Sequence, residues 1–275
     1  KMATFFGEVL PVISRAVDDE EDEDEIISER CDPFIHWSSR IQSALLHLPN
    51  KKLECNILIV AIGPAAVGFT DTCIKHGDYY LVANIFSGLK DDDRQTLMQN
   101  APTDKTCYLY RSNEDASTFI CLCNMDVAVE QCYAWVNELF SGLDSDDAYV
   151  VVLNTLPTSR FTCEVPTSDM PCPFLRGLKT NKFAGVPFCP VLEQPNLVTG
   201  LAAQILTYCQ AYGMKALLYQ CYTKARKLVD LETMKAFTPC LESTPIRDII
   251  RKNPEADEQL RDIVQKHEVQ DTLYL

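Results

Sequence analysis

The residues best suited to chemistry stand at the end of the chain, in the tripeptide Leu273-Tyr274-Leu275. The terminal carboxylate of Leu275 is a charge that a partner's cation can bind, and Tyr274 offers both apolar area and a hydroxyl group. Leu273 adds a second apolar contact. This combination predicts noncovalent docking into a pocket of a partner protein rather than catalysis. The alternative is an ordinary chain end without a function of its own.

The binding energy available to this tail is small. Burial of one or two apolar side chains contributes about 1.5–3 kcal/mol each, and a charge-assisted hydrogen bond to the carboxylate contributes about 1.5–3 kcal/mol. Ordering the tail costs several kcal/mol in return. We therefore expect the tail alone to bind with a Kd on the order of millimolar to tens of micromolar. Useful affinity then requires additional contacts of the globular body.

Sequence signatures of catalysis are missing. The turn Gly63-Pro64-Ala65-Ala66-Val67-Gly68 follows a predicted strand, at the position where many α/β enzymes bind phosphate groups. It has neither the glycine pattern of a dinucleotide fold nor the lysine and hydroxyl of a P-loop, and Pro64 removes a backbone donor. The chain has no Gly-x-Ser-x-Gly elbow. We predict no catalytic residue and no cofactor, while a cysteine paired with a distant histidine stays open.

The thirteen cysteines are scattered, and several stand in apolar runs. Cys121, Cys123, Cys209 and Cys221 have the surroundings of small buried hydrophobic side chains. The sequence contains no Cys-x-x-Cys pair and only four histidines, His36, His47, His76 and His267. We therefore expect neither a metal site nor a disulfide framework. This cysteine usage indicates a reducing compartment, and the expected locations are the cytoplasm and the nucleus.

The formal net charge is −14, and eight negative charges form an unbroken run from Asp18 to Glu25. Adjacent like charges repel one another and the run has no apolar face, so we expect a disordered segment. It is either a solvated spacer or an acidic contact for a basic partner surface. The acidic balance argues against nucleic-acid binding. No stretch approaches the roughly 18 consecutive apolar residues of a membrane span.

The body of the chain is predicted to alternate strands and helices. Apolar runs predict strands at 56–62, 79–86, 106–111, 117–123, 148–153 and 216–221. Helical spacing is found at 66–74, 129–140 and 197–212, and a helix or irregular lead-in is expected at 34–48. Prolines interrupt 155–195, where we expect an irregular insert. The pattern predicts an α/β fold, a three-layer sandwich with a largely parallel, partly mixed sheet, followed by C-terminal helices.

The expected domain organisation has three parts. Residues 1–33 form a leader with the acidic run, residues 34–268 a single α/β domain, and residues 269–275 a flexible docking tail. A last helix should begin at Asn253-Pro254, an N-cap followed by proline at the first helical position. It should end near Glu268 and be followed by a short mobile strap, Val269-Gln270-Asp271-Thr272, before the terminal tripeptide.

Several segments together resemble a known family. They are Thr4-Phe5-Phe6-Gly7-Glu8-Val9, Ala61-Ile62-Gly63, Pro173-Phe174-Leu175, Leu178-Lys179-Thr180, Leu192-Glu193-Gln194-Pro195-Asn196, Leu218-Tyr219, Cys221-Tyr222-Thr223 and Phe237 with Pro239. The chain resembles the proteasome assembly chaperones, and in particular the first subunit of the chaperone heterodimer. The similarity is densest from Pro173 to Thr223 and weak over residues 14–56.

The resemblance implies a function that composition does not show. The family subunit pairs with a related second subunit, and the heterodimer gathers alpha subunits into the seven-membered ring of the proteasome core particle. Its hydrophobic-tyrosine-any tail docks into a pocket between alpha subunits, which assigns Leu273, Tyr274 and Leu275 to that contact. The family fold resembles nucleoside phosphorylases without their active-site residues. Partners are therefore the second subunit, the alpha subunits and the immature core particle.

Two other functions stay open. One is an orphan α/β enzyme related to nucleoside phosphorylases or hydrolases, which predicts a pocket with converging polar groups and a titratable residue of perturbed pKa. The other is a scaffold whose tail has no role. Co-purification of a second chaperone subunit and of unprocessed core particles distinguishes both from a chaperone.

Overall fold

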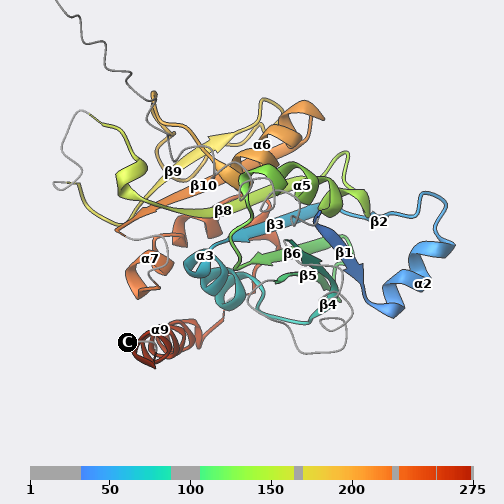
Figure 1. The fold of residues 1–275 in the computed structure, drawn as a ribbon, viewed down its shortest axis with the longest axis horizontal. Coiled ribbons are helices and arrows are strands. Elements are labelled where there is room, and N and C mark those ends of the chain that lie inside the picture. Colours follow the sequence, from blue (N-terminus) through green and yellow to red (C-terminus); the bar gives the residue numbers. More distant parts are fainter. Residues whose placement is uncertain (1–31, 88–105, 164–169, 225–228, 252, 274–275) are drawn as a thin grey trace, which may run out of the picture.

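The sheet at the centre of the molecule has eight strands, in the order β1-β4-β5-β6-β3-β8-β10-β9 (Figure 1). The computed structural model describes residues 32–87, 106–163, 170–224, 229–251 and 253–273, so the acidic run Asp18 to Glu25 lies outside the described residues. The strands are β1 (Phe34–Trp37), β3 (Ile57–Ile62), β4 (Tyr79–Phe86), β5 (Thr106–Ser112), β6 (Thr118–Cys123), β8 (Tyr149–Pro157), β9 (Phe174–Lys179) and β10 (Lys215–Thr223). Two further short strands, β2 (Leu53–Glu54) and β7 (Leu143–Asp144), pair with each other.

The helices lie between and after the strands. They are α2 (Ser39–His47), α3 (Pro64–Phe69) with a π-helical turn at Thr70–Ile74, α5 (Cys132–Ser141), α6 (Gly200–Ala211), α7 (Leu231–Lys235), α8 (Ile246–Ile249) and α9 (Ala256–Leu273). Single 3₁₀ turns cover Val129–Gln131, Thr158–Arg160 and Thr238–Glu242. Among the helices of the described ranges, none has the length and apolar character needed to cross a lipid bilayer.

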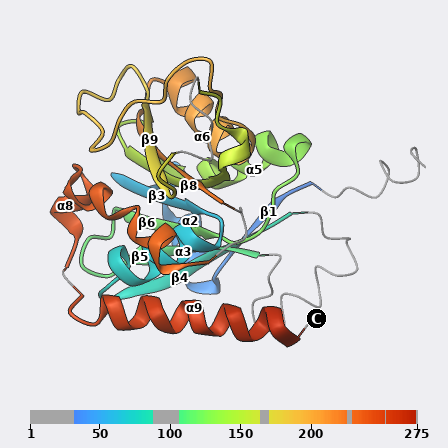
Figure 2. The ribbon, with the colours of Figure 1, turned by 90° about the vertical axis from the view of Figure 1, so that its left-hand side faces the viewer.

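The helices cover both faces of the sheet, which confirms the predicted sandwich. In β3, Leu58 and Val60 point into a core shared with α5 and α6, while Ile59 and Ala61 point into a second core shared with α3, α7, α8 and α9. A strand buried on both faces reads as a continuous apolar run, which is why the sequence predicted it. Figure 2 shows α5 and α6 above the sheet and α9 below it; α3 packs on the same core as α9.

The sheet is mixed, with less parallel pairing than we expected. Only the central pairs β6-β3, β3-β8 and β8-β10 are parallel. The pairs β1-β4, β4-β5, β5-β6 and β9-β10 are antiparallel. The short connection 113–117 between β5 and β6 accounts for one of them, because a connection of this length can join only antiparallel neighbours.

Both edge strands differ from the sequence prediction. β1 occupies part of the region where a helix or irregular lead-in was expected, and α2 follows it at once. β9 lies inside the proline-rich stretch for which an irregular insert was predicted. Edge strands are short and hydrogen-bond on one side only, so their sequences can be polar or flanked by proline. The apolar pattern that identified β3 is therefore weak at both edges.

Candidate docking site and neighbouring cavities

The helix that leads to the C-terminal tripeptide packs firmly against the body. In α9, Leu260 is buried, and Ile263 and Val264 pack against the core formed with α3 and α7. Gly68 in α3 makes room for this contact, because a Cβ atom there would lie 3.0 Å from the sulfur of Met234 and 3.5 Å from Cγ2 of Ile263. The apolar face of this helix thus holds it in place.

The start of α9 is tied down by polar contacts. The side-chain amide of Asn253 donates hydrogen bonds to the Thr72 carbonyl and to Oε1 of Gln259, both at 3.0 Å, and its Oδ1 accepts from the Glu255 amide at 3.0 Å. Asn253 therefore caps the turn before the helix, which begins at Ala256 and not at Pro254 as we expected. The Lys235 ammonium lies 2.6 Å from the Asp257 carboxylate and lowers the pKa of that carboxyl.

The helix is longer than predicted. α9 continues to Leu273, so the expectation of a non-helical strap at Val269–Thr272 is wrong. No glycine or proline stands between His267 and Leu273, and nothing in the local sequence ends a helix there. Leu273 closes the helix, while Tyr274 and Leu275 lie outside the described residues. Nine residues at about 1.5 Å each place Leu273 about 14 Å along the axis from Val264 (Figure 2).

The turn from Gly63 to Gly68 serves packing. Gly63 has a φ of 89°, and an added Cβ would lie 2.7 Å from Oγ1 of Thr155, so this position favours glycine on two counts. Its amide donates to the Cys123 carbonyl at 2.9 Å. The residues Ala65 to Phe69 that follow are all buried in the core. A turn closed by its own neighbours leaves little space for a phosphate group.

A cavity of about 410 Å³ lies at the carboxyl ends of β3 and β8, where α/β folds often bind ligands. It is lined by Ile62, Met125, Val127, Val129, Asn154, Leu156, Arg160 and the first residues of α6, Thr199–Ala202. The side-chain amide of Asn154 is occupied, because it donates to Oε1 of Gln220 at 2.9 Å. No histidine, cysteine or carboxylate is among these lining residues, so the cavity has no nucleophile with a base.

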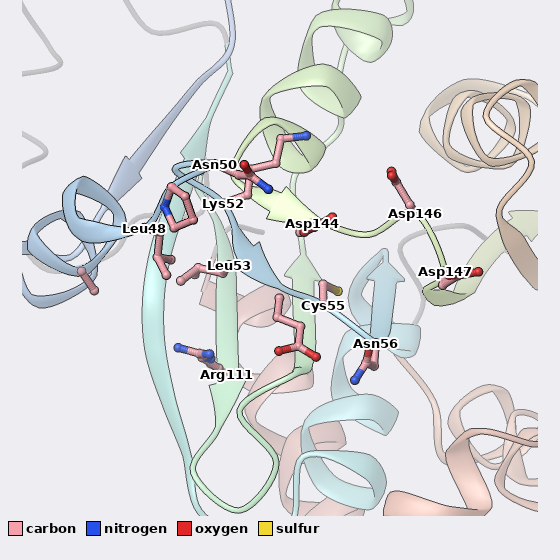
Figure 3. Close-up of a pocket in the computed structure, with 13 residues that line it drawn as sticks. Leu48, Asn50, Lys52, Leu53, Cys55, Asn56, Arg111, Asp144, Asp146 and Asp147 are labelled. Atoms are coloured by element: carbon pink, nitrogen blue, oxygen red, sulfur yellow. The ribbon is translucent and has the colours of Figure 1, made fainter.

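A larger cavity, of about 670 Å³, opens at the other ends of the strands (Figure 3). Its lining is mixed in charge, with Glu54, Asp144, Asp146, Asp147, Lys52 and Arg111. Figure 3 shows Asp146 and Asp147 on one side and Arg111 on the other. Cys55 also lines it, but burial raises the pKa of this thiol to about 12. A protonated thiol is a poor nucleophile at neutral pH, so Cys55 is not activated for covalent chemistry.

The buried cysteines behave as the sequence predicted. Cys121 and Cys123 are fully buried in β6, and Cys209 and Cys221 are fully buried in α6 and β10. Burial raises the pKa of Cys209 and of Cys221 to about 12. A third cavity, of about 330 Å³, is lined by His76 without a cysteine. The three cavities therefore bring no cysteine–histidine pair together.

Sequence reasoning missed a second surface feature. Four large apolar side chains, Val186, Phe188, Val191 and Leu197, are more than half exposed in the connection between β9 and α6. The sequence predicted an irregular insert at 155–195, a prediction that does not specify which side chains are displayed. The sequence signal that could have found this surface is its low content of acidic residues, because Glu193 is the only one between Phe174 and Met214.

Comparisons with known proteins cover the whole chain. The family described as "Proteasome assembly chaperone 4", abbreviated PAC1, matches residues 2–275. A protein named "Proteasome assembly chaperone 1" from Xenopus laevis is 36% identical over 289 residues, which covers 100% of both chains. The protein of the same name from Homo sapiens is 31% identical over 286 residues and 99% of both chains.

Two solved structures share the fold. A protein of unknown function from Thermoplasma acidophilum aligns with a TM-score of 0.55 at 14% identity, over 86% of this chain and 97% of the other. An archaeal proteasome activator from Pyrococcus furiosus aligns with a TM-score of 0.52 at 11% identity, over 89% of this chain and 99% of the other. At these identities the likeness concerns the fold alone.

Proposed function

The chain belongs to the proteasome assembly chaperone family, and from this premise we propose that it promotes assembly of the alpha ring of the proteasome core particle. The observation that carries the proposal is the match over the full length of the chain, which includes the C-terminal tripeptide. Family membership supports a chaperone role in proteasome assembly. The assembly steps and the contacts that the chain makes go beyond family membership and are proposed.

The tail is proposed as the docking element. Tyr274 and the terminal carboxylate of Leu275 enter a pocket between two alpha subunits, where the carboxylate meets a lysine and Leu273 packs on the rim. Support comes from the chemistry of the tripeptide and from α9, whose first half is anchored to the body while its helical backbone continues to Leu273. A helix that reaches the tripeptide lowers the entropy lost on docking, compared with a mobile strap.

The proposed working form is a heterodimer with a related second chaperone subunit. Two subunits, each with a tail, bind a ring of alpha subunits through effective concentration, which compensates for the low affinity of a single tail. We propose the cytoplasm and the nucleus as the compartments, in keeping with twelve free cysteines in the described part of the chain.

The test is affinity purification of the tagged full-length chain from its own cells, followed by mass spectrometry. We expect a second chaperone subunit in equal amount, together with alpha subunits and unprocessed core particles. The control is the same tag on an unrelated protein of similar charge. Recovery of the chain alone, or with mature core particles only, would contradict the proposed role.

The enzyme alternative has no support in the cavities. A relative of nucleoside phosphorylases needs a phosphate site and converging polar groups, whereas the turn at Gly63 is filled by packing and the cavity beside α6 lacks a base. We therefore expect no phosphorolysis of any nucleoside by the purified protein. An assay with a panel of purine and pyrimidine nucleosides and inorganic phosphate checks this. Activity that is lost on altering Pro64 or Gly63 would overturn the prediction.

A further inference from the structure

The connection between β9 and α6, together with the outer side of α6, forms a surface that we name the β9–α6 surface. It displays Val186, Phe188, Val191 and Leu197, which are 74%, 54%, 61% and 77% exposed. Single exposed apolar side chains are common on any protein. Four large ones within twelve residues of one connection indicate a contact that covers them.

The connection is held in a defined conformation. The Gly177 amide of β9 donates to the Pro190 carbonyl at 2.8 Å, and the Leu192 amide donates to the Gly177 carbonyl at 2.9 Å. A Cβ at Gly177 would lie 2.6 Å from Cβ of Pro187, so glycine is needed for this close approach. The connection therefore covers part of the free edge of β9 and holds its apolar side chains outward.

Two side-chain contacts fix the end of the connection that leads to α6. The Arg176 guanidinium binds both oxygens of the Glu193 carboxylate, with Nε at 2.8 and 2.9 Å. The Asn196 side chain accepts from the Thr162 amide at 2.7 Å and donates to the Thr162 carbonyl at 2.9 Å. A surface that is ordered before binding loses little conformational entropy when a partner covers it.

The outer side of α6 lacks charge. Its exposed and half-buried side chains are Ala203, Gln204, Thr207, Tyr208, Gln210 and Ala211. The helix contains no charged residue at all, in a chain of 275 residues with 39 acidic and 25 basic ones. A solvated helix normally carries charges on its outer face, as α9 does. Depletion of charged residues is part of the compositional signal of a protein interface.

A shallow groove lies between the end of β9 and α6. It has a volume of about 320 Å³ and is lined by Leu178, Lys179, Thr180, Val198, Ala203, Leu206, Thr207 and Gln210. Figure 1 shows β9 and α6 next to each other at the upper side of the molecule. The groove offers an apolar floor for side chains of a partner, with the exposed Lys179 at its rim.

Charge indicates which partner fits. Between Phe174 and Met214 the basic residues are Arg176, Lys179 and Lys182, and the one carboxylate, Glu193, is already paired with Arg176. A second copy of this chain placed on the same surface would oppose two positively charged rims without a carboxylate to pair with them. A partner with an apolar centre and acidic residues at its rim complements both features.

We propose that the β9–α6 surface binds the second chaperone subunit, through a partner surface that is apolar at its centre and carries carboxylates opposite Lys179 and Lys182. This assignment rests on the proposed function. The surface wraps the β9 edge of the sheet, because Phe183 and Cys189 of the connection pack on the same core as α9 whereas α6 packs on the opposite face. α9 lies away from this edge, so a partner there leaves the C-terminal helix free (Figure 2).

The test uses the heterodimer formed by the full chain and the subunit that co-purifies with it. The substitutions Val186→Ser with Leu197→Ser remove two exposed side chains, and Lys179→Glu with Lys182→Glu reverses the rim charge. The matched control is Leu46→Ser with Leu81→Ser, because these side chains are 71% and 38% exposed in α2 and β4, near the β1 edge of the sheet and away from β9 and α6. Kd is measured by titration of the purified subunits, and circular dichroism checks that each variant folds.

We expect each pair of substitutions in the β9–α6 surface to weaken the heterodimer by about tenfold or more, and the control to change Kd by less than about threefold. An unchanged Kd for both surface variants would overturn the assignment and leave the proposed function intact. If the surface variants instead lose self-association, the assignment is wrong and the surface binds a second copy of this chain. If they lose alpha-subunit binding while the heterodimer stays intact, the assignment is wrong and the surface binds an alpha subunit. Failure of the unaltered chain to bind any second subunit would instead overturn the proposed heterodimer.

Discussion

At the scale of single residues, the proposed docking step depends on very few groups. The tripeptide offers two leucine side chains, one phenol ring and one carboxylate. The phenol ring supplies the largest area that can be removed from water, and it also carries a hydroxyl group that can bond within a pocket. The side chain of Leu275 is expected to matter less than its carboxylate. The contributions of Tyr274 and Leu275 can therefore be separated by substitution.

We expect Tyr274→Ala to reproduce most of the loss of binding that removal of the whole tripeptide causes. Leu275→Ala should change the Kd for alpha-ring intermediates little, since the terminal carboxylate remains. Titration of immature core particles with the two purified variants measures both effects. Equal losses for the two variants would contradict the assignment of the main contact to Tyr274.

Tyr222 provides a residue-scale test of the fold itself. Its ring is fully buried and packs against Phe161 and Phe174 at centroid distances of 4.8 and 5.2 Å. Its hydroxyl is buried and has no hydrogen-bond partner within the described residues. A buried polar group without a partner costs about 1–3 kcal/mol.

We therefore expect Tyr222→Phe to leave the free energy of unfolding unchanged or to raise it by about 1 kcal/mol. The control Tyr222→Ala removes the ring as well and should lower it by about 3–5 kcal/mol. Urea denaturation of the heterodimer followed by circular dichroism compares the two. A large loss of stability for Tyr222→Phe would mean that the hydroxyl has a partner outside the described residues.

At the scale of elements, the sequence predicted the strands whose residue pattern is set by burial. β3, β8 and β10 are central strands, and their apolar runs, such as Ile57–Ile62, follow from burial on both faces. β1 and β9 were missed because edge strands need no such run. The length of α9 was underestimated, since the mostly polar segment Val269–Thr272 was predicted to be a mobile strap after a helix that ends near Glu268. Its backbone continues because no residue there breaks it.

The anchoring of α9 can be tested at Leu260, which is only 2% exposed. We expect Leu260→Ala to lower the free energy of unfolding by about 2–4 kcal/mol, because it leaves a cavity between α9 and the core beneath the sheet. The matched control is Gln265→Ala, an exposed position of the same helix, which should change it by less than about 0.5 kcal/mol. Thermal unfolding of both variants provides the comparison, and equal stability of the two would show that α9 does not pack as described.

The β9–α6 surface shows where sequence reasoning at this scale ends. Val186, Phe188 and Leu197 are apolar residue types that a sequence pattern alone assigns to a core as readily as to a surface. Only the backbone path, held by Gly177 and Asn196, determines that they point outward. The tail differs, because its chemistry can be recognised from a terminal position without any fold.

At the scale of the whole molecule, the two proposed contacts lie in different places. The β9–α6 surface wraps the β9 edge of the sheet, with α6 on one face, and α9 lies across the opposite face away from that edge (Figure 2). A partner subunit at the β9 edge therefore does not block the helix that leads to the tail. This arrangement is compatible with the two contacts that we propose, heterodimer formation and docking on the alpha ring, occurring together.

The most direct test of the account is the Kd of the heterodimer for immature core particles, measured with and without Leu273 to Leu275. The deletion should leave the melting temperature and heterodimer formation unchanged, because a chain end contributes little to the core. It should weaken binding by about tenfold or more, since burial of one apolar side chain contributes about 1.5–3 kcal/mol. Binding of the deletion variant as tight as that of the intact chain in a quantitative pull-down would contradict the central claim.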